Sequence, residues 1–187
     1  MKNDRLINVV NVIGSPINGG VQNFILALSN YDKNFNIKRH IICLYSNCGS
    51  LKQKFIDQNI NIYFCPLIAN DRGFKPYFFW KKVRQMIGYL FFIIKLFIII
   101  RKSNAEIVFC HEPANIIEQL FVSKLLAIPF VNHMHKEFNY FENFKFFKYI
   151  YKNINFISDS EALITSNLNN LKLESKWVKK IPLITAT

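Results

Sequence analysis

Apolar residues gather along this chain in short runs that alternate with longer stretches of helical spacing. The run from Leu6 to Ile13 is rich in β-branched residues, which is typical of a strand buried on both faces of a sheet. It ends at the loop-forming cluster from Gly14 to Gly20. Apolar residues then recur from Val21 to Leu28 at the spacing of one helix face. The chain is therefore predicted to begin with a strand, a glycine-containing loop and a helix.

The same alternation continues along the rest of the chain. Short apolar runs predict further strands at His40–Leu44, Ile60–Phe64, Ile107–Cys110, Phe130–His133 and Asn155–Ile157. Helical stretches are predicted at Leu51–Gln58, Ala114–Leu126 and Asn143–Lys152. Strands that alternate with helices favour an α/β fold, here a Rossmann-like, doubly wound parallel sheet. Ligands of such folds bind beyond the carboxyl ends of the strands, so the residues that follow each strand are the candidates for function.

The most apolar stretch, from Phe78 to Lys102, predicts a long helix with basic residues at both ends. Its uninterrupted core contains Lys95 and is shorter than the roughly 20 apolar residues that a membrane-spanning helix needs. One interpretation is a helix that is partly buried and partly laid on an anionic bilayer. The other is a wholly buried core helix with charged ends. In the first case, Lys81, Lys82 and Arg84 are the candidate membrane contacts.

Composition narrows the choice of protein class. The 187 residues fit one substantial domain, and 51% apolar against 19% charged residues predict a well-buried core. The formal net charge of +12 indicates an anionic partner, such as nucleic acid, an acidic membrane surface or a phosphorylated substrate. Nucleic acid is disfavoured because the aromatic residues lie in apolar runs and not in an RNA-binding motif. The N-terminal apolar run is broken by Asn8 and Asn11, so no signal peptide is predicted and we expect a cytoplasmic protein.

The four cysteines, Cys43, Cys48, Cys65 and Cys110, show none of the paired short spacings of zinc sites. Three of them lie within or beside apolar runs. We therefore expect buried free thiols and no metal site.

The loop that precedes the first helix is a candidate anion site. It lacks the Lys-Ser/Thr ending of a phosphate-binding P-loop and the three-glycine pattern of a dinucleotide fold. Its adjacent glycines, Gly19 and Gly20, nevertheless allow backbone amides to approach an anion at a helix N-terminus, where the helix dipole favours negative charge. A plain tight turn accounts for the same spacing.

Histidines end two of the predicted strands. His111 directly follows one strand, and His133 and His135 lie at the end of the next. Imidazoles at strand ends can hydrogen-bond a hydroxylated ligand or take part in proton transfer, although a structural hydrogen bond explains any one of them. We favour a site for His111 and His135, which end adjacent strands. The segment Ser158–Glu161, which includes Ser160, has the chemistry of a helix cap, and capping is the default role of Glu161.

Taken in order, these motifs resemble the N-terminal domain of the retaining glycosyltransferases of family 4, which have the GT-B fold. The stretch from Gly19 to Phe24 resembles that family's Gly-Gly-Val/Ala loop and first helix. The segment Glu106–His111 resembles its Asp-Ile-Val-His-x-His strand, with Phe109 in place of the first histidine. Val131–His135 resembles the next strand, which ends in a family histidine, and Ser158–Glu161 resembles a Val-Ser-Glu segment. The resemblance covers nearly the whole chain.

The resemblance implies a role for each motif. In that family the glycine loop approaches the donor diphosphate and the histidine at the position of His135 lies near the transferred sugar. Gly19, Gly20, Ser160 and Glu161 are thus implied as substrate-binding residues. His111 and His135 are implied as catalytic, with no cofactor beyond the nucleotide-sugar donor.

The family's second domain carries a basic pair and a Glu-x7-Glu element that hold the donor, and nothing in this sequence matches either. We therefore expect residues 1–187 to be the acceptor-side domain alone, with the donor-binding C-terminal domain missing and activity dependent on a complementary domain or subunit. The expected function is transfer of a sugar to a lipid-linked or polysaccharide acceptor at the inner face of a membrane. The alternative is a non-catalytic, membrane-associated α/β module, or the partner subunit of a split glycosyltransferase.

Overall fold

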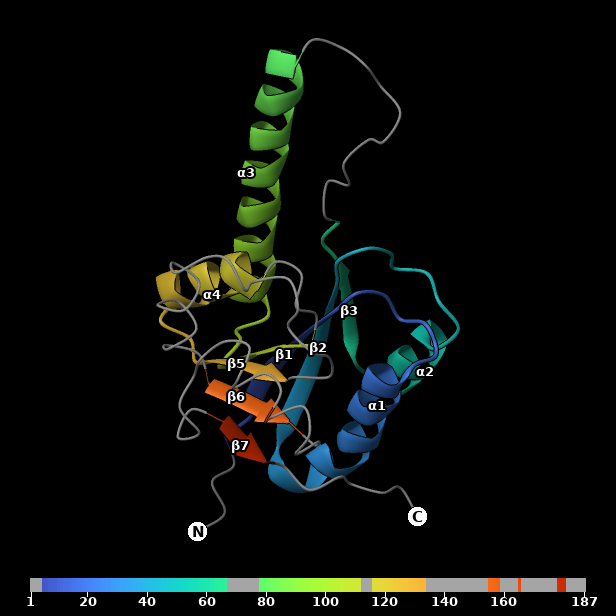
Figure 1. Ribbon diagram of the computed structural model, residues 1–187. Helices are drawn as coiled ribbons and strands as arrows, with labels where there is room; N and C mark the ends of the chain where they lie inside the picture. The colour runs from blue at the N-terminus through green and yellow to red at the C-terminus, as the bar shows by residue number, and fades with distance from the viewer. Residues whose placement is uncertain are drawn as a thin grey trace.

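In the described part of the chain, one sheet of seven parallel strands, in the order β3-β2-β1-β4-β5-β6-β7, forms the centre of the fold (Figure 1). The computed structural model describes residues 5–66, 78–111, 116–133, 155–158, 165 and 178–180. In chain order the strands are β1 (Ile7–Ile13), β2 (Ile37–Cys43), β3 (Asn61–Phe64), β4 (Ile107–Cys110), β5 (Phe130–His133), β6 (Asn155–Ser158) and β7 (Val178–Lys180). The prediction of a Rossmann-like parallel α/β fold is confirmed.

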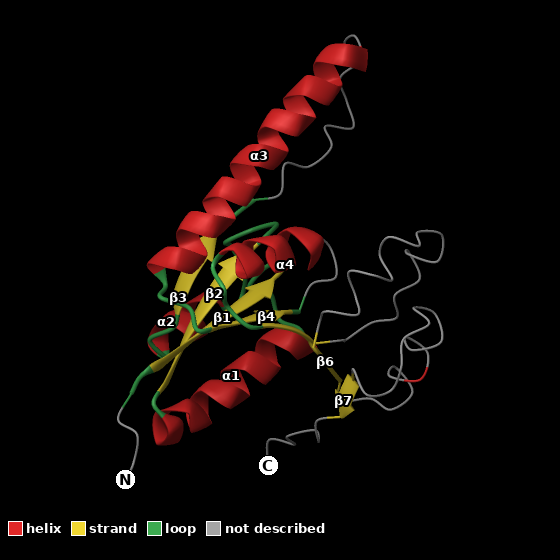
Figure 2. Ribbon diagram, turned by 90° about the vertical axis from the view of Figure 1, so that its left-hand side faces the viewer, coloured by secondary structure: helices red, strands yellow, loops and turns green. Residues whose placement is uncertain are grey.

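Helices cover both faces of the sheet. They are α1 (Gly20–Asp32), the 3-10 turn η1 (Lys33–Phe35), α2 (Lys52–Asp57), α3 (Phe78–Lys102) and α4 (Ile116–Leu125). In Figure 2, α1 and α2 lie on one side of the sheet and α3 and α4 on the other. The described part of the chain is thus a three-layer sandwich, as expected when helices connect parallel strands.

The alternation of side chains along the strands gives each face its own core. On one face, Val10 and Val12 of β1 pack with Phe92 and Leu96 of α3. On the other, Ile13 belongs to a cluster with Ile25 of α1, Ile41 of β2 and Phe55 of α2. Because successive side chains of a strand point to opposite faces, Asn11 lies between Val10 and Val12 on the α1 side.

The strand order reverses direction at β1. From β1 the chain first builds outward through β2 and β3, and then returns to add β4 on the other side of β1. In open parallel sheets, the crevice outside the carboxyl ends of the strands at such a switch point is where ligands bind. The residues that follow β1 and β4 therefore define the candidate site.

Most predicted boundaries hold to within a residue or two, but β2 is longer than predicted. It begins at Ile37, whereas the predicted strand began at His40. The prediction was too short because Lys38 and Arg39 interrupt the apolar pattern, although both residues pair in register with β1. The Arg39 guanidinium forms an ion pair with Asp32 at 2.5 Å, and both side chains are only 9% exposed. The partner carboxylate allows a charged residue to remain within a buried strand.

The remaining differences concern two short elements that were not predicted and two predicted helices that reach into residues outside the described ranges. Sequence patterns missed β7 and η1, which are only three residues each and lack a periodic apolar signal. Helix α4 begins at Ile116 in the described region, which excludes residues 112–115. The helix predicted at Asn143–Lys152 lies outside the described residues.

Helix α3 departs from the compact outline of the rest. Its C-terminal half packs on the sheet through Phe92, Leu96 and Ile100, whereas its N-terminal half extends well beyond the sheet and α4 (Figures 1 and 2). Tyr89 Oη donates a hydrogen bond of 2.6 Å to Glu118 Oε1, which links α3 to α4. Within the described residues, no helix is long and apolar enough to cross a membrane.

Candidate functional site at the carboxyl edge of the sheet

The glycine loop connects the carboxyl end of β1 to the first turn of α1. Helix α1 begins at Gly20, and the Asn23 amide donates to Gly19 O at 3.0 Å, so the helical bonding pattern starts there. A Cβ added at Gly20 would meet no atom within 4 Å, whereas one at Gly19 would lie 2.7 Å from Gln22 Oε1. Gly20 is therefore not required by internal packing. It leaves open space at a helix N-terminus, where amides and dipole favour an anion.

A second loop, which contains Gly49 and Ser50, packs against the glycine loop. A Cβ at Gly49 would lie 2.3 Å from Pro16 O, so this position requires glycine for the two backbones to approach. The Leu51 amide donates to Pro16 O, and the Asn18 amide donates to Ser50 Oγ. Sequence reasoning missed Gly49, because a lone glycine in a polar loop carries no pattern that separates close approach from an ordinary turn.

His111 is held firmly at the end of β4. Its amide donates to Val12 O at 3.0 Å, and its Nε2 lies 3.1 Å from Asn11 Oδ1. The residue is 6% exposed, and its ring stacks on Phe109 at a centroid distance of 6.3 Å. Both Asn11 and His111 project toward the α1 side of the sheet. Among the described residues, no group accepts a hydrogen bond from the buried Asn11 Nδ2.

His133 completes this cluster from β5. Its ring centroid lies 5.4 Å from that of His111 and 5.1 Å from that of Phe24, which meets it edge-on. Phe24 is one turn into α1, so the contact fixes the start of α1 above the ends of β4 and β5. The structure thus brings the glycine loop and His111 to one edge of the sheet, as predicted. It also adds His133, which the prediction mentioned but did not include in the site.

The other predicted site residues are reached only in part. His135, Ser160 and Glu161 lie outside the described residues; the strands that lead to them, β5 and β6, end at this same edge. Lys81, Lys82 and Arg84 belong to the first turns of α3, and only their backbone is described. Their roles stay predictions. No group of three His, Cys, Asp or Glu side chains that could hold a metal ion occurs in the described parts of the chain.

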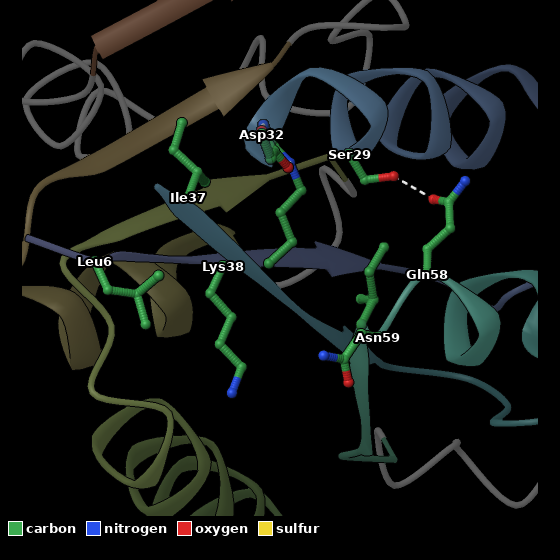
Figure 3. A pocket seen from close by; sticks show the side chains of 9 residues that line it. Leu6, Ser29, Asp32, Ile37, Lys38, Gln58 and Asn59 are labelled. Carbon is green, nitrogen blue, oxygen red and sulfur yellow. Dashed lines mark hydrogen bonds and ion pairs between the residues drawn. The ribbon is translucent and has the colours of Figure 1, made fainter. Parts of the chain in front are cut away.

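A cavity of about 260 Å³ lies at the opposite edge of the sheet (Figure 3). It is lined by the amino ends of β1 and β2 and by the C-terminal ends of α1 and α2. Lys38 and the Asp32–Arg39 ion pair contribute to its wall. The cavity lies at the amino ends of the strands and is therefore separate from the crevice at their carboxyl ends. Arg39, the most buried cation in its wall, is already paired with Asp32. We assign the candidate site to the carboxyl edge.

His40 differs from the two histidines at that edge. It lies on the α3 side of β2, where Nε2 donates to Asn8 Oδ1 and Nδ1 accepts from Asn61 Nδ2. Burial, and secondarily the positive charge of Lys38, lowers the pKa of His40 below its usual value. A neutral imidazole with one donor and one acceptor satisfies both contacts, so His40 is a structural residue.

Comparison with known proteins identifies solved structures that share this fold. No protein-family model and no curated protein matches the sequence. Solved structures do match: a glycosyltransferase from Rickettsia africae (TM-score 0.67, 18% identity) covers 95% of this chain, and Anabaena HepE in complex with UDP and glucose (TM-score 0.65, 14% identity) covers 94%. The lipopolysaccharide outer core galactosyltransferase WaaB also matches, with a TM-score of 0.59, 9% identity and 92% coverage.

The extent of these matches is as informative as their similarity. This chain spans 43% of the Rickettsia structure and 44% of each of the other two. It therefore shares its α/β fold with a part of each of these structures and spans less than half of their length. At these levels of identity, the likeness defines the fold and not the reaction.

Proposed function

We propose that this chain is the acceptor-side, N-terminal half of a retaining glycosyltransferase of family 4. Together with a nucleotide-sugar-binding domain, it would transfer a sugar to a lipid-linked or polysaccharide acceptor. The observation that carries the proposal is the meeting of the glycine loop, the start of α1 and His111 at the switch point of the sheet. The fold neighbours, among them one in complex with UDP and glucose, support the substrate class.

The chemistry assigned to this half is electrostatic. The amides at the start of α1, beside Gly19 and Gly20, would stabilise the departing diphosphate, because they offer donors and a positive dipole end without reorganisation. His135 and His111 would orient sugar hydroxyls, and Ser160 and Glu161 would contribute to substrate binding. Since Asn11 holds the His111 imidazole at its Nε2, that ring is fixed in place before any ligand arrives.

A substitution at Gly20 tests the diphosphate role without disturbing the fold. Gly20→Asp places a negative charge at the helix N-terminus, where it favours the helix but repels a diphosphate, and the added side chain has open space. In the enzyme reconstituted with a donor-binding domain, we expect turnover to fall by about tenfold to a hundredfold, the range of about 1.4 to 2.7 kcal/mol of lost stabilisation.

The matched control is Gly20→Ala, which fills the same space without charge and is expected to keep most of the turnover. Equal turnover of Gly20→Asp and the wild type would contradict the diphosphate role. His135→Ala should reduce turnover with little loss of stability, and unchanged turnover would remove His135 from the site. Transfer by the isolated chain, with no second domain supplied, would contradict the proposal that it is only half of an enzyme.

The membrane location is the second part of the proposal. A basic protein with a projecting apolar helix is suited to the inner face of a membrane, where Lys81, Lys82 and Arg84 would contact anionic lipid. This location also fits the alternative role as the membrane-bound partner subunit of a split transferase. Donor turnover in the reconstituted enzyme separates the two roles, because a non-catalytic partner subunit would tolerate both Gly20→Asp and His135→Ala.

A further inference from the structure

Helix α3 is apolar on the side that faces the protein and on the side that faces away. Phe92, Leu96, Ile99 and Ile100 are buried against the sheet and α4. A second group of large apolar side chains, here called the outer stripe, consists of Ile87, Leu90, Phe91, Ile94 and Ile98. At 3.6 residues per turn, the outer stripe covers about 100° of the helix and is centred opposite the buried group. Such a width is the usual apolar face of a helix that packs against something.

The outer stripe is exposed in this structure. Phe91 is 66% exposed and Leu90 is 58% exposed, and Ile98, the least exposed of the five, still reaches 43%. Met86, one turn before Leu90, is 72% exposed and extends the apolar surface toward the projecting end of the helix. Large contiguous apolar surfaces of this kind mark an interaction site.

The charges around the outer stripe identify the chemistry of the partner. Helix α3 contains no acidic residue, and its last turn carries Arg101 and Lys102, both exposed. Arg101 continues the outer stripe itself, one turn beyond Ile98. Lys95 lies to one side, with its Nζ 5.8 Å from the Phe64 ring centroid of β3. The surface is therefore apolar along its length and cationic at its C-terminal end.

A second copy of the chain is a poor partner for this surface. Parallel packing of two α3 helices would bring Arg101 and Lys102 against the same residues of the other copy. Antiparallel packing would bring them toward the first turns of the other α3, whose only charged residues are basic. Neither arrangement supplies an acidic residue from α3, and like charges placed together disfavour association.

We infer that the outer stripe of α3 inserts into an anionic lipid bilayer, with Arg101 and Lys102 at the level of the lipid headgroups. The inference rests on the membrane location proposed above and names the surface and the lipid chemistry. Apolar side chains would enter the acyl boundary while the two cations contact phosphate groups, the usual arrangement of an interfacial helix. The buried face of α3 would keep the domain, and thus the carboxyl-edge site, attached at the membrane surface.

Vesicle flotation of the full chain tests this inference with two matched variants. Phe91→Glu lies in the outer stripe at 66% exposure, and Phe35→Glu lies in η1, away from α3, at 67% exposure. Both replace an exposed phenylalanine with the same charge. On vesicles of phosphatidylcholine with added phosphatidylglycerol, we expect Phe91→Glu to weaken binding about tenfold or more, because the phenylalanine ring that would enter the lipid is lost. Phe35→Glu should bind like the wild type.

Three results would overturn the inference. They are equal losses in the two variants, equal wild-type binding to vesicles with and without phosphatidylglycerol, and sedimentation showing a dimer that Phe91→Glu dissociates. A transfer assay with a soluble acceptor separates this inference from the proposed function. Normal vesicle binding without any turnover in the reconstituted enzyme counts against the transferase role alone, and normal turnover by a Phe91→Glu enzyme that no longer floats supports the outer stripe.

Discussion

The two faces of α3 have nearly the same composition and different surroundings. Leu96 and Ile100 are fully buried, whereas Leu90 and Ile94 on the outer stripe are 58% and 44% exposed. Hydropathy alone does not distinguish the two faces, because a helix that is apolar all round gives no periodic signal. What separates them is the sheet, which covers only one side. Burial in this helix is therefore decided by tertiary structure and not by residue type.

The largest difference between buried and exposed positions should appear in the reaction rates of the cysteine thiols. Cys65 lies beneath α3, with its Sγ 3.8 Å from Phe92 O, and burial raises the pKa of its thiol from 9.0 to about 11. Cys48 is exposed in a loop. At neutral pH, we expect Cys65 to react with a thiol reagent at least about a hundredfold more slowly than Cys48, since only the thiolate reacts. Mass-spectrometric labelling rates measure the ratio, and similar rates would mean that α3 readily leaves the sheet.

A pair of leucines in the same helix measures the energetic difference between the faces. Leu96→Ala should lower the free energy of unfolding by about 2–5 kcal/mol, because it leaves a cavity in the core. Leu90→Ala, on the outer stripe, should change it by about 0.5 kcal/mol or less. Urea unfolding followed by circular dichroism gives both values. A large cost at Leu90 would show that this position is covered in the folded protein.

The cations at the end of the outer stripe should each contribute less free energy to vesicle binding than Leu96 contributes to the stability of the fold. Near an anionic surface, each Lys or Arg is worth about 1 kcal/mol, so Arg101→Gln and Lys102→Gln should each weaken vesicle binding about fivefold. Added salt should reduce wild-type binding, and it should reduce the binding of the doubly substituted variant by a smaller factor. Lys54→Gln, which removes an exposed cation from α2 on the opposite side of the sheet from α3, is the control. If it weakens binding equally, net charge and not this surface attracts the lipid.

The smallest expected effect is a pH dependence of stability that arises from His40, on the α3 side of the sheet. The pKa of His40 is lowered by burial and by Lys38, so the unfolded chain binds a proton more readily than the folded one. Stability from this residue is present above the unfolded pKa of about 6.5 and is lost as the pH falls through the folded value. Urea midpoints measured from neutral to mildly acidic pH should decline, and His40→Gln should flatten that decline. An unchanged slope would assign it to other groups.

The positions of most strands along the chain were predictable from local patterns. The strands at Ile107–Cys110 and Phe130–His133 were predicted with their observed bounds. The first is a short apolar run between Glu106 and His111, and the second begins directly after Pro129. β2 was predicted too short, since Lys38 and Arg39 conceal its beginning. The ion pair that permits Arg39 there depends on Asp32, a residue of another element, and no local pattern contains that information.

The candidate site was predictable only as a set of positions. Strand ends identified Gly19, Gly20 and His111, but not the contacts among them. The Asn11–His111 hydrogen bond and the His111–His133 ring contact arise because β1, β4 and β5 are adjacent, which is a property of the strand order. Gly49 was missed for the same reason, since its requirement comes from Pro16 in a separate loop.

The pairing of β1 with β4 has a consequence for how this protein is made. Asn11 and His111, which touch in the finished sheet, are 100 residues apart in the chain. At about 5–20 residues per second, one edge of β1 waits roughly 5–20 s on the ribosome for its neighbour, while the apolar α3 emerges in between. An open strand edge beside an apolar helix is prone to wrong pairing. We therefore expect the nascent chain, more than the folded domain, to depend on chaperones or on early contact with lipid.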